Sequence, residues 1–139
     1  MVESNSFPIY QGNCFKAGLY GTDIFYVEIS GEIPFTTHDA SELLETGWKL
    51  SDGKRMCNLF VVEKTMLPNE EVISFITSPG VSDFTIAQAF VIGSLPQRLL
   101  GNFLIRFKSP KYPMKLFNNV DAAIIWLRLH QSEVTNENS

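Results

Sequence analysis

Two short apolar runs in the middle of the chain most constrain what it can fold into. The first is residues 56–62, and the second is residues 84–92, which only Gln88 interrupts. Neither run alternates apolar and polar residues, as a strand with one solvent-exposed face would. We therefore predict two central strands that are buried on both faces. Parallel strands of this kind need crossover helices between them, so the two runs predict an α/β fold.

Further helices and strands are predicted on both sides of these runs. Residues 14–20 and 24–29 flank the turn Gly21-Thr22-Asp23, a pattern typical of a β-hairpin. Residues 114–117 are expected to form a brief fifth strand. Helices are predicted after four capping positions, which are Thr36 or Thr37, Asn69, Ser94, and Asn118 or Asn119.

These elements together predict a single α/β domain over residues 1–139. We expect a mixed sheet of about five strands with about four α-helices, in which right-handed crossovers join the parallel strands. Residues 1–6 and 131–139 are polar and are expected to be frayed.

The helix predicted over residues 95–107 has two kinds of face. We expect its large apolar residues to form the inner face that packs on the sheet. Arg98, Asn102 and Arg106 follow an i, i+4, i+8 spacing on another face. The expected inner residues are Leu95, Leu99, Leu100, Phe103, Leu104 and Phe107.

Composition and charge exclude several classes of protein. Hydrophobic residues make up 45% of the 139 residues and charged residues 19%, which is enough apolar matter for a folded core. A net charge of -4 is unsuited to neutralising phosphates, so we expect no general nucleic-acid binding. No apolar run approaches the roughly 20 residues that span a bilayer, and the N-terminus does not read as a signal peptide. We expect a soluble, cytoplasmic protein with no integral membrane segment.

No group of residues indicates catalysis, a metal site or a cofactor. Cys14 and Cys57 are far apart and have no metal-type spacing, so we expect two ordinary thiols. His38 lies at a predicted helix start, and His130 in a last helical turn, where the helix dipole favours a cation. Gly93-Ser94 lacks the other glycines and the lysine of a phosphate-binding loop and is better explained as a helix cap. We therefore predict that the protein is not an enzyme and needs no cofactor. A hydrolase or transferase would require a polar cleft with perturbed titratable groups.

The stretch QRLLGNFLIRFKSPKYPMKLFNNVDAAIIWL, residues 97–127, resembles the C-terminal half of the small SpoIIAA-like proteins. These are relatives of the STAS domains that act as anti-sigma-factor antagonists, and the order of elements over the whole chain agrees with that fold. The resemblance implies a STAS-like fold and a role in protein interaction. The residues that carry it are Arg98, Gly101-Asn102, the turn at residues 110–113, Lys115-Leu116-Phe117, Asp121-Ala122 and Trp126-Leu127.

One departure from that family concerns regulation by phosphorylation. Regulated antagonists present an Asp-Ser-Ser-Gly type of loop after the central strand, with its serine at a helix start. The corresponding residues 63–69 hold neither serine nor glycine, and Thr65 is their only hydroxyl. A phosphorylation switch is therefore not implied by the resemblance, although a phosphate at a helix N-terminus is physically reasonable.

A cluster of basic residues has three alternative interpretations. Arg98, Asn102 and Arg106, with Lys108 and Lys111 in the next loop, form either a solvated surface or a docking surface for an acidic partner or ligand. In a third interpretation, Asn102 anchors the loop by bonding to its backbone.

The leading prediction is a non-catalytic STAS-like regulatory module that acts through an unidentified protein partner. The alternative is a small-ligand or lipid-binding domain, suggested by eleven Phe and two Trp residues and by the kinship of this fold to lipid-carrying domains. That alternative requires an apolar cavity of roughly 300 Å³ or more. Homodimerisation is a further expectation, because the hairpin supplies a sheet edge that must be covered, charged or paired.

Overall fold

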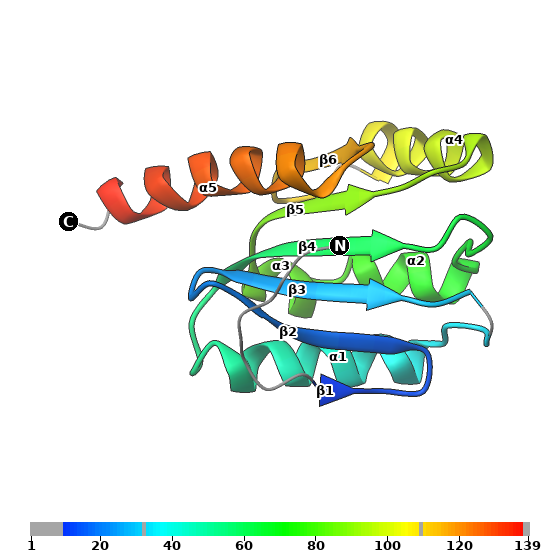
Figure 1. The fold of residues 1–139 in the computed structure, drawn as a ribbon, viewed down its shortest axis with the longest axis horizontal. Coiled ribbons are helices and arrows are strands. Elements are labelled where there is room, and N and C mark those ends of the chain that lie inside the picture. The colour runs from blue at the N-terminus through cyan, green and yellow to red at the C-terminus, as the bar shows by residue number, and fades with distance from the viewer. Residues whose placement is uncertain (1–9, 32, 109, 138–139) are drawn as a thin grey trace.

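The computed structural model of the chain describes residues 10–31, 33–108 and 110–137. Figure 1 shows the order of the elements along the chain. They are β1 (Tyr10–Gln11), β2 (Phe15–Tyr20), β3 (Ile24–Ile29), α1 (Thr37–Leu50), β4 (Met56–Val62), α2 (Glu70–Ile76), α3 (Pro79–Phe84), β5 (Thr85–Val91), α4 (Leu95–Phe103), the π-helical turn η1 (Leu104–Lys108), β6 (Met114–Phe117) and α5 (Val120–Glu137).

The described strands form one mixed sheet of six strands in the sequential order β1-β2-β3-β4-β5-β6. β1, β2 and β3 are antiparallel neighbours, whereas β3, β4, β5 and β6 run parallel to one another. The predicted α/β class with a mixed sheet is confirmed. The strand beyond the expected five is β1, which pairs only Tyr10 with Ala17 and Gln11 with Lys16.

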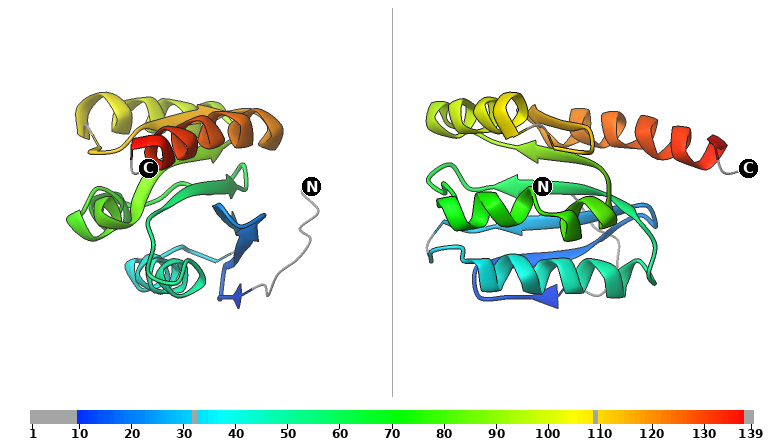
Figure 2. Two further views of the ribbon diagram at one scale, coloured as in Figure 1. Left: turned by 90° about the vertical axis from the view of Figure 1, so that its left-hand side faces the viewer. Right: turned by 180° about the vertical axis from the view of Figure 1, so that it is seen from behind.

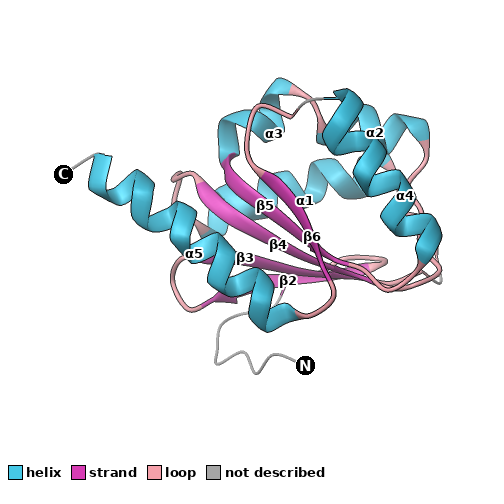
Figure 3. Cartoon of the chain, turned by 90° about the horizontal axis from the view of Figure 1, so that it is seen from above, coloured by secondary structure: helices cyan, strands magenta, loops and turns pink. Residues whose placement is uncertain are grey.

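The helices cover the two faces of the sheet unequally. Helices α1 to α4 lie on one face (Figure 2), and α5 crosses the other face alone (Figure 3). Crossovers of one hand between strands in sequential order place all connecting helices on the same side. α5 connects no strands, so it is free to cover the opposite face.

The central strands β4 and β5 are buried on both faces, as predicted. In β4, Cys57 and Leu59 pack in the core beneath α5 together with Ala123 and Leu127. Met56 and Phe60 belong to the core on the opposite face. A strand with apolar neighbours on both sides has no reason to alternate, which explains its continuous apolar run.

The predicted caps of α1 and α2 are confirmed. Thr36 caps α1 by accepting a hydrogen bond from the Asp39 backbone N–H, and the Asp39 carboxylate accepts one from the Thr36 N–H at 2.8 Å. This reciprocal pair is a capping box. Asn69 caps α2 by accepting a bond from the Val72 N–H at 2.9 Å.

Two helical segments differ from expectation. The short helix α3 was not among the predicted helices. It begins at Pro79, and proline is well suited to a first helical position. Helix α5 continues past residue 131, where fraying was expected, to Glu137. The other residues expected to fray, 1–6 and 138–139, lie outside the described part of the chain. Within the described part, no helix is long and apolar enough to cross a membrane.

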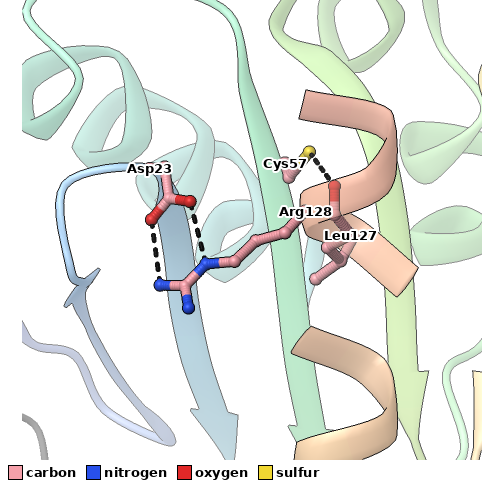
Figure 4. Close-up of polar contacts among 4 residues, drawn as sticks. All are labelled: Asp23, Cys57, Leu127 and Arg128. Atoms are coloured by element: carbon pink, nitrogen blue, oxygen red, sulfur yellow. Dashed lines mark hydrogen bonds and ion pairs between the residues drawn. The ribbon is translucent and has the colours of Figure 1, made fainter. Parts of the chain in front are cut away.

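Polar contacts tie α5 to the strands beneath it (Figure 4). The Arg128 guanidinium donates to both carboxylate oxygens of Asp23 in the hairpin turn, at 3.0 and 3.3 Å. The Cys57 thiol donates to the Leu127 carbonyl at 3.4 Å. The turn and the last helix, far apart in sequence, are thereby held together.

Gly47 in α1 is a site where the packing excludes a side chain. A Cβ at this position would lie 2.8 Å from Phe84 Cζ and 3.2 Å from Phe25 Cε2. Both rings are buried and stiff, and they pack edge-to-face with centroids 6.0 Å apart. The helix therefore approaches the sheet as closely as a glycine allows.

We predict that Gly47→Ala destabilises the protein. Overpacking a core typically costs about 1–3 kcal/mol, which exceeds the gain of up to about 1 kcal/mol in helix propensity. The measurement is urea unfolding followed by circular dichroism. Gly80→Ala in α3 is the matched control, because the added methyl group meets its nearest atom, Leu44 Cδ2, at 3.5 Å. Equal stability of the two variants would contradict the prediction.

Candidate functional site: an exposed helix face and the cavity behind it

Helix α4 lies on the sheet with a different face from the one predicted. Its buried residues are Gln97 and, where the helix passes into η1, Leu104. Gly101 lies so close to β6 that a Cβ there would be 2.8 Å from the Leu116 side chain. The prediction that all the large apolar residues of residues 95–107 face inward is therefore wrong.

Four of those residues instead form an exposed row, called here the apolar stripe. Leu95, Leu99, Phe103 and Phe107 are 67%, 62%, 48% and 64% exposed. They follow one another every four residues along α4 and η1. The rings of Phe103 and Phe107 also contact each other, with centroids 5.0 Å apart. Exposed rows of large apolar residues mark interaction surfaces more often than single exposed residues do.

The five residues predicted as a partner or ligand surface all lie beside this stripe or directly after it. Arg98, Asn102, Arg106, Lys108 and Lys111 are exposed. Arg98 donates to Asn118 Oδ1 at 2.9 Å, and the Arg106 guanidinium lies 5.6 Å from the centre of the Phe107 ring. The spacing of Arg98 and Asn102 places them in the helical row next to the apolar stripe.

This part of the chain also differs in charge from the rest. Residues 84–120 contain no Asp or Glu, although the chain has fifteen acids in all. The same residues hold five cations, namely Arg98, Arg106, Lys108, Lys111 and Lys115. A protein with a net charge of -4 thus carries a basic surface at α4 and the loop that follows it.

The loop after η1 is anchored at its far end. Tyr112 is buried, and its hydroxyl donates to the Ile76 carbonyl at the end of α2, at 3.1 Å. Burial raises the pKa of Tyr112, so this hydroxyl remains a donor at physiological pH. Lys111 is held next to this anchor and remains exposed.

An apolar cavity of about 130 Å³ lies behind α4, on the face of the sheet covered by α1 to α4. α4 supplies Leu100 and Gly101 to its wall, and η1 supplies Leu104. The sheet contributes Asn58, Phe60, Gln88 and Phe90, and helices α1, α2 and α3 and the loop at residues 66–68 line other parts of it. The cavity is smaller than the roughly 300 Å³ expected for a drug-sized ligand.

The sheet side of this cavity contains a buried polar pair. Asn58 and Gln88 lie opposite each other in the parallel register of β4 and β5, and both are at most 3% exposed. Asn58 Nδ2 donates to Gln88 Oε1 at 3.2 Å and to Thr85 Oγ1 at 2.9 Å. A register shift at Met56/Cys57 accompanies this arrangement.

One atom of this pair has no partner. Asn58 Oδ1 is buried and accepts no hydrogen bond from any described residue. Leaving a buried acceptor unsatisfied costs about 1–3 kcal/mol, so such an atom calls for a physical explanation.

Gln97 is also a buried amide, but both its nitrogen and its oxygen have hydrogen-bond partners. Its Nε2 donates to the Glu63 and Met66 carbonyls at 2.6 and 3.0 Å, and its Oε1 accepts from the Gly93 N–H at 3.0 Å. These bonds fasten α4 to the loop after β4. All three bonds are to backbone, so Gln97 is explained by the fold.

The remaining sequence candidates are not brought together. His38 lies in the first turn of α1, and Thr65 lies in the loop after β4. The Thr65 hydroxyl donates to Glu63 Oε1 at 3.0 Å. The His130 ring packs against Trp126 with centroids 4.6 Å apart. Within residues 10–31, 33–108 and 110–137, no three His, Cys, Asp or Glu side chains are grouped so as to hold a metal ion.

Sequence reasoning missed both the exposure of the apolar stripe and the buried pair of Asn58 with Gln88. Helical periodicity in residues 95–107 allows either of two rows of side chains to face the sheet. Apolar content alone favours the row that contains Leu95, Leu99 and Phe103. The signal for Asn58 and Gln88 was present, since each is a lone amide inside a run predicted to be buried on both faces.

Comparison with known proteins identifies the family. The profile described as "Domain of unknown function (DUF7793)" matches residues 19–131, and the chain therefore belongs to this family. The match extends from the end of β2 into α5 and includes both α4 and the cavity. No curated protein and no solved structure matches the chain.

We predict that both thiols react slowly in the folded protein. Cys14 and Cys57 are free and buried. Burial, with a smaller contribution from the Asp39 carboxylate, raises the pKa of Cys14 to about 11. Burial, with a smaller contribution from Asp23, raises the pKa of Cys57 to about 12. At pH 8, labelling by a thiol-specific disulfide reagent should be about 100-fold or more slower than in urea-unfolded protein, whose thiols titrate near pH 8.5.

The raised pKa values of the two thiols also predict how the stability of the fold changes with pH. A thiol whose pKa is raised by folding contributes its full stability below the unfolded pKa. That stability is lost as pH rises through about 9 toward 11 or 12. The urea midpoint should therefore fall between pH 9 and pH 11. Rapid labelling at pH 8 without unfolding would show that the thiols are accessible and would contradict both expectations.

Proposed function

We propose that this protein is a non-catalytic, STAS-like regulatory module that binds a protein partner through α4 and η1. The observation that carries the proposal is the apolar stripe, four large side chains in one exposed row beside a row of basic residues. The partner that complements such a surface is an amphipathic segment with apolar anchors and acidic flanks.

The geometry of α4 supports a binding role for this surface. The four apolar side chains are spaced as the anchors of a helical recognition surface are, and aromatic residues are common among the residues that dominate binding energy. The helix ends in the π-helical turn η1, which carries Phe107 and Arg106. Turns of this kind are rare, and many occur at functional sites.

The basic row favours a different protein over a second copy of this chain. Two-fold packing of α4 on α4 would bring Arg98 and Arg106 of both copies near one another, and like charges at an interface are unfavourable. Self-association through the hairpin edge is a separate expectation. In the described structure β1 covers only part of that edge, and sedimentation at several protein concentrations tests it.

We also propose that the protein is cytoplasmic, and this location and the regulatory role each have their own support. The STAS-like resemblance of residues 97–127 implies an interaction domain, and Arg98 and Gly101-Asn102 in that motif lie at the proposed surface. Two free, buried thiols agree with a reducing compartment.

The first experiment identifies the partner at the surface itself. A photo-crosslinking amino acid placed at Leu99 in native cells should capture a protein, whereas the same group at Ile125 should not. Ile125 is an equally exposed residue, at 66%, on α5. Purified segments of the captured protein then serve for affinity measurements with the full chain.

We predict that Leu99→Ser with Phe103→Ser weakens binding of that segment by about 30-fold or more, the effect of losing a central anchor. Arg98→Glu with Lys111→Glu should also weaken it, and more so at low salt, because charge complementarity is screened by ions. The matched control is Ile125→Ser with Leu129→Ser on α5. All these side chains are exposed, so the melting temperature should change little.

Two outcomes would refute the proposal. In the first, the α5 control loses as much affinity as the α4 variants. In the second, no protein is captured at Leu99 while the chain binds anionic vesicles through the same residues, which would make the surface a membrane-binding one.

A further inference from the structure

The cavity behind α4 is open to solvent rather than enclosed. Leu67, in its wall, is 51% exposed, and Phe75 of α2 and Leu100 of α4 are only partly buried. Phe60 and Phe90 also line the cavity and remain partly exposed, although they belong to the two central strands of the sheet. The opening therefore leads from the surface beside α4 down to the sheet.

The lining of the cavity is rich in aromatic rings and free of charge. Phe60 and Phe90 are opposite each other in the register of β4 and β5, and their rings stack with centroids 5.3 Å apart. Among the described residues that line the cavity, there is no Asp, Glu, Lys, Arg or His. A charged group placed there would lose its hydration without meeting a counter-charge, whereas an aromatic ring would meet other rings. The phenylalanines of the lining are Phe25, Phe35, Phe60, Phe75, Phe84 and Phe90.

The cavity opens beside the apolar stripe of α4. Because an α-helix has 3.6 residues per turn, residues four apart form rows along it. On one side of the stripe lies the row of Arg98 and Asn102. On the other side lies the row of Leu100 and Leu104, which line the cavity. A segment that covers the stripe therefore has the basic row along one edge and the cavity along the other.

The charge of this region indicates the kind of occupant. Residues 84–120 hold five cations and no acid, so the surface of α4 complements an acidic partner. On α4 the stripe separates Arg98 from the cavity, so one occupant reaches both only if it spans the width of the helix. An amphipathic protein segment does so, with acids along one edge and a large apolar side chain at the other.

We infer that the partner proposed for α4 inserts an aromatic side chain into this cavity, while acids on its other edge pair with the basic row. The ring enters between Leu67 and Leu100 and packs on Phe60 and Phe90. An aliphatic side chain fits the same opening but lacks the contacts between rings. This inference rests on the proposed function and adds the type of residue that the partner supplies.

The test uses the full chain and the purified segment of the protein captured at Leu99. A photo-crosslinking amino acid at Leu67 should capture the same segment, next to a Phe, Tyr or Trp. In the chain labelled with ¹³C at its methionine methyl groups, the segment should shift the signals of Met66 and Met114, which line the cavity. Met56 is buried on the same face of the sheet without lining the cavity, so its signal should stay in place.

Matched substitutions on the two molecules then test the contact between rings. Leucine in place of the aromatic residue of the segment should weaken binding about threefold to tenfold, the value of aromatic pairing. Phe60→Leu in the chain should have a similar effect, and both changes together should weaken binding no more than either alone, because they remove one shared contact. Ile125→Ser on α5 is the control and should leave the affinity unchanged. Leu67→Ser, at the exposed rim, repeats the comparison if Phe60→Leu does not fold.

The outcomes separate this inference from the proposed function. Capture at Leu99 without capture at Leu67, or losses of affinity that simply add in the double variant, would overturn the inference and leave α4 as the binding surface. Shifts of Met66 and Met114 by decanoate, with none by the segment, would make the cavity a site for alkyl chains and would also overturn it. If no protein is captured at Leu99, the proposed function and this inference fail together.

Discussion

The parallel pairing of β4 with β5 is the constraint on which the rest of the structure depends. Both strands are buried on two faces, so the side chains of each strand must pack into two hydrophobic cores at once. Beneath α5 the small residues Ala87 and Ala89 let the helix approach the sheet closely. On the other face the same pairing puts Asn58 beside Gln88 and Phe60 beside Phe90. The cavity wall is thus a direct consequence of strand register.

Helix α4 separates the two candidate sites of the molecule. Its inner side, with Leu100 and Gly101, forms part of the cavity wall, and its outer side carries the apolar stripe. Two contacts set its rotation about its own axis. One is the set of backbone bonds made by Gln97, and the other is the close approach of Gly101 to Leu116. With that rotation, the largest apolar residues of the helix are left facing solvent.

The parts of the fold that could be predicted from sequence are those with a local cause. The absence of alternation predicted β4 and β5, and side-chain caps predicted the starts of α1 and α2. The face of α4 could not be predicted in this way. Apolar periodicity favours Leu95, Leu99 and Phe103 as the inner row, whereas backbone carbonyls at Glu63 and Met66 require a buried amide instead. Those carbonyls come from a loop roughly 30 residues earlier, so no local pattern records them.

Gln97 and Asn58 show two different ways in which this fold accommodates a buried amide. Both are buried amides that interrupt apolar surroundings, and sequence alone treats them alike. Gln97 bonds to three backbone groups, so its burial is fully explained by holding α4 in place. Asn58 uses its amide hydrogens within the sheet and leaves its oxygen buried and unpaired. An apolar residue of the same size would remove that unpaired oxygen but would leave the buried Gln88 Oε1 without the hydrogen that Asn58 donates to it. The amide hydrogens of Asn58 therefore have a structural reason in the pairing of β4 with β5, and its oxygen alone has no partner among the described residues.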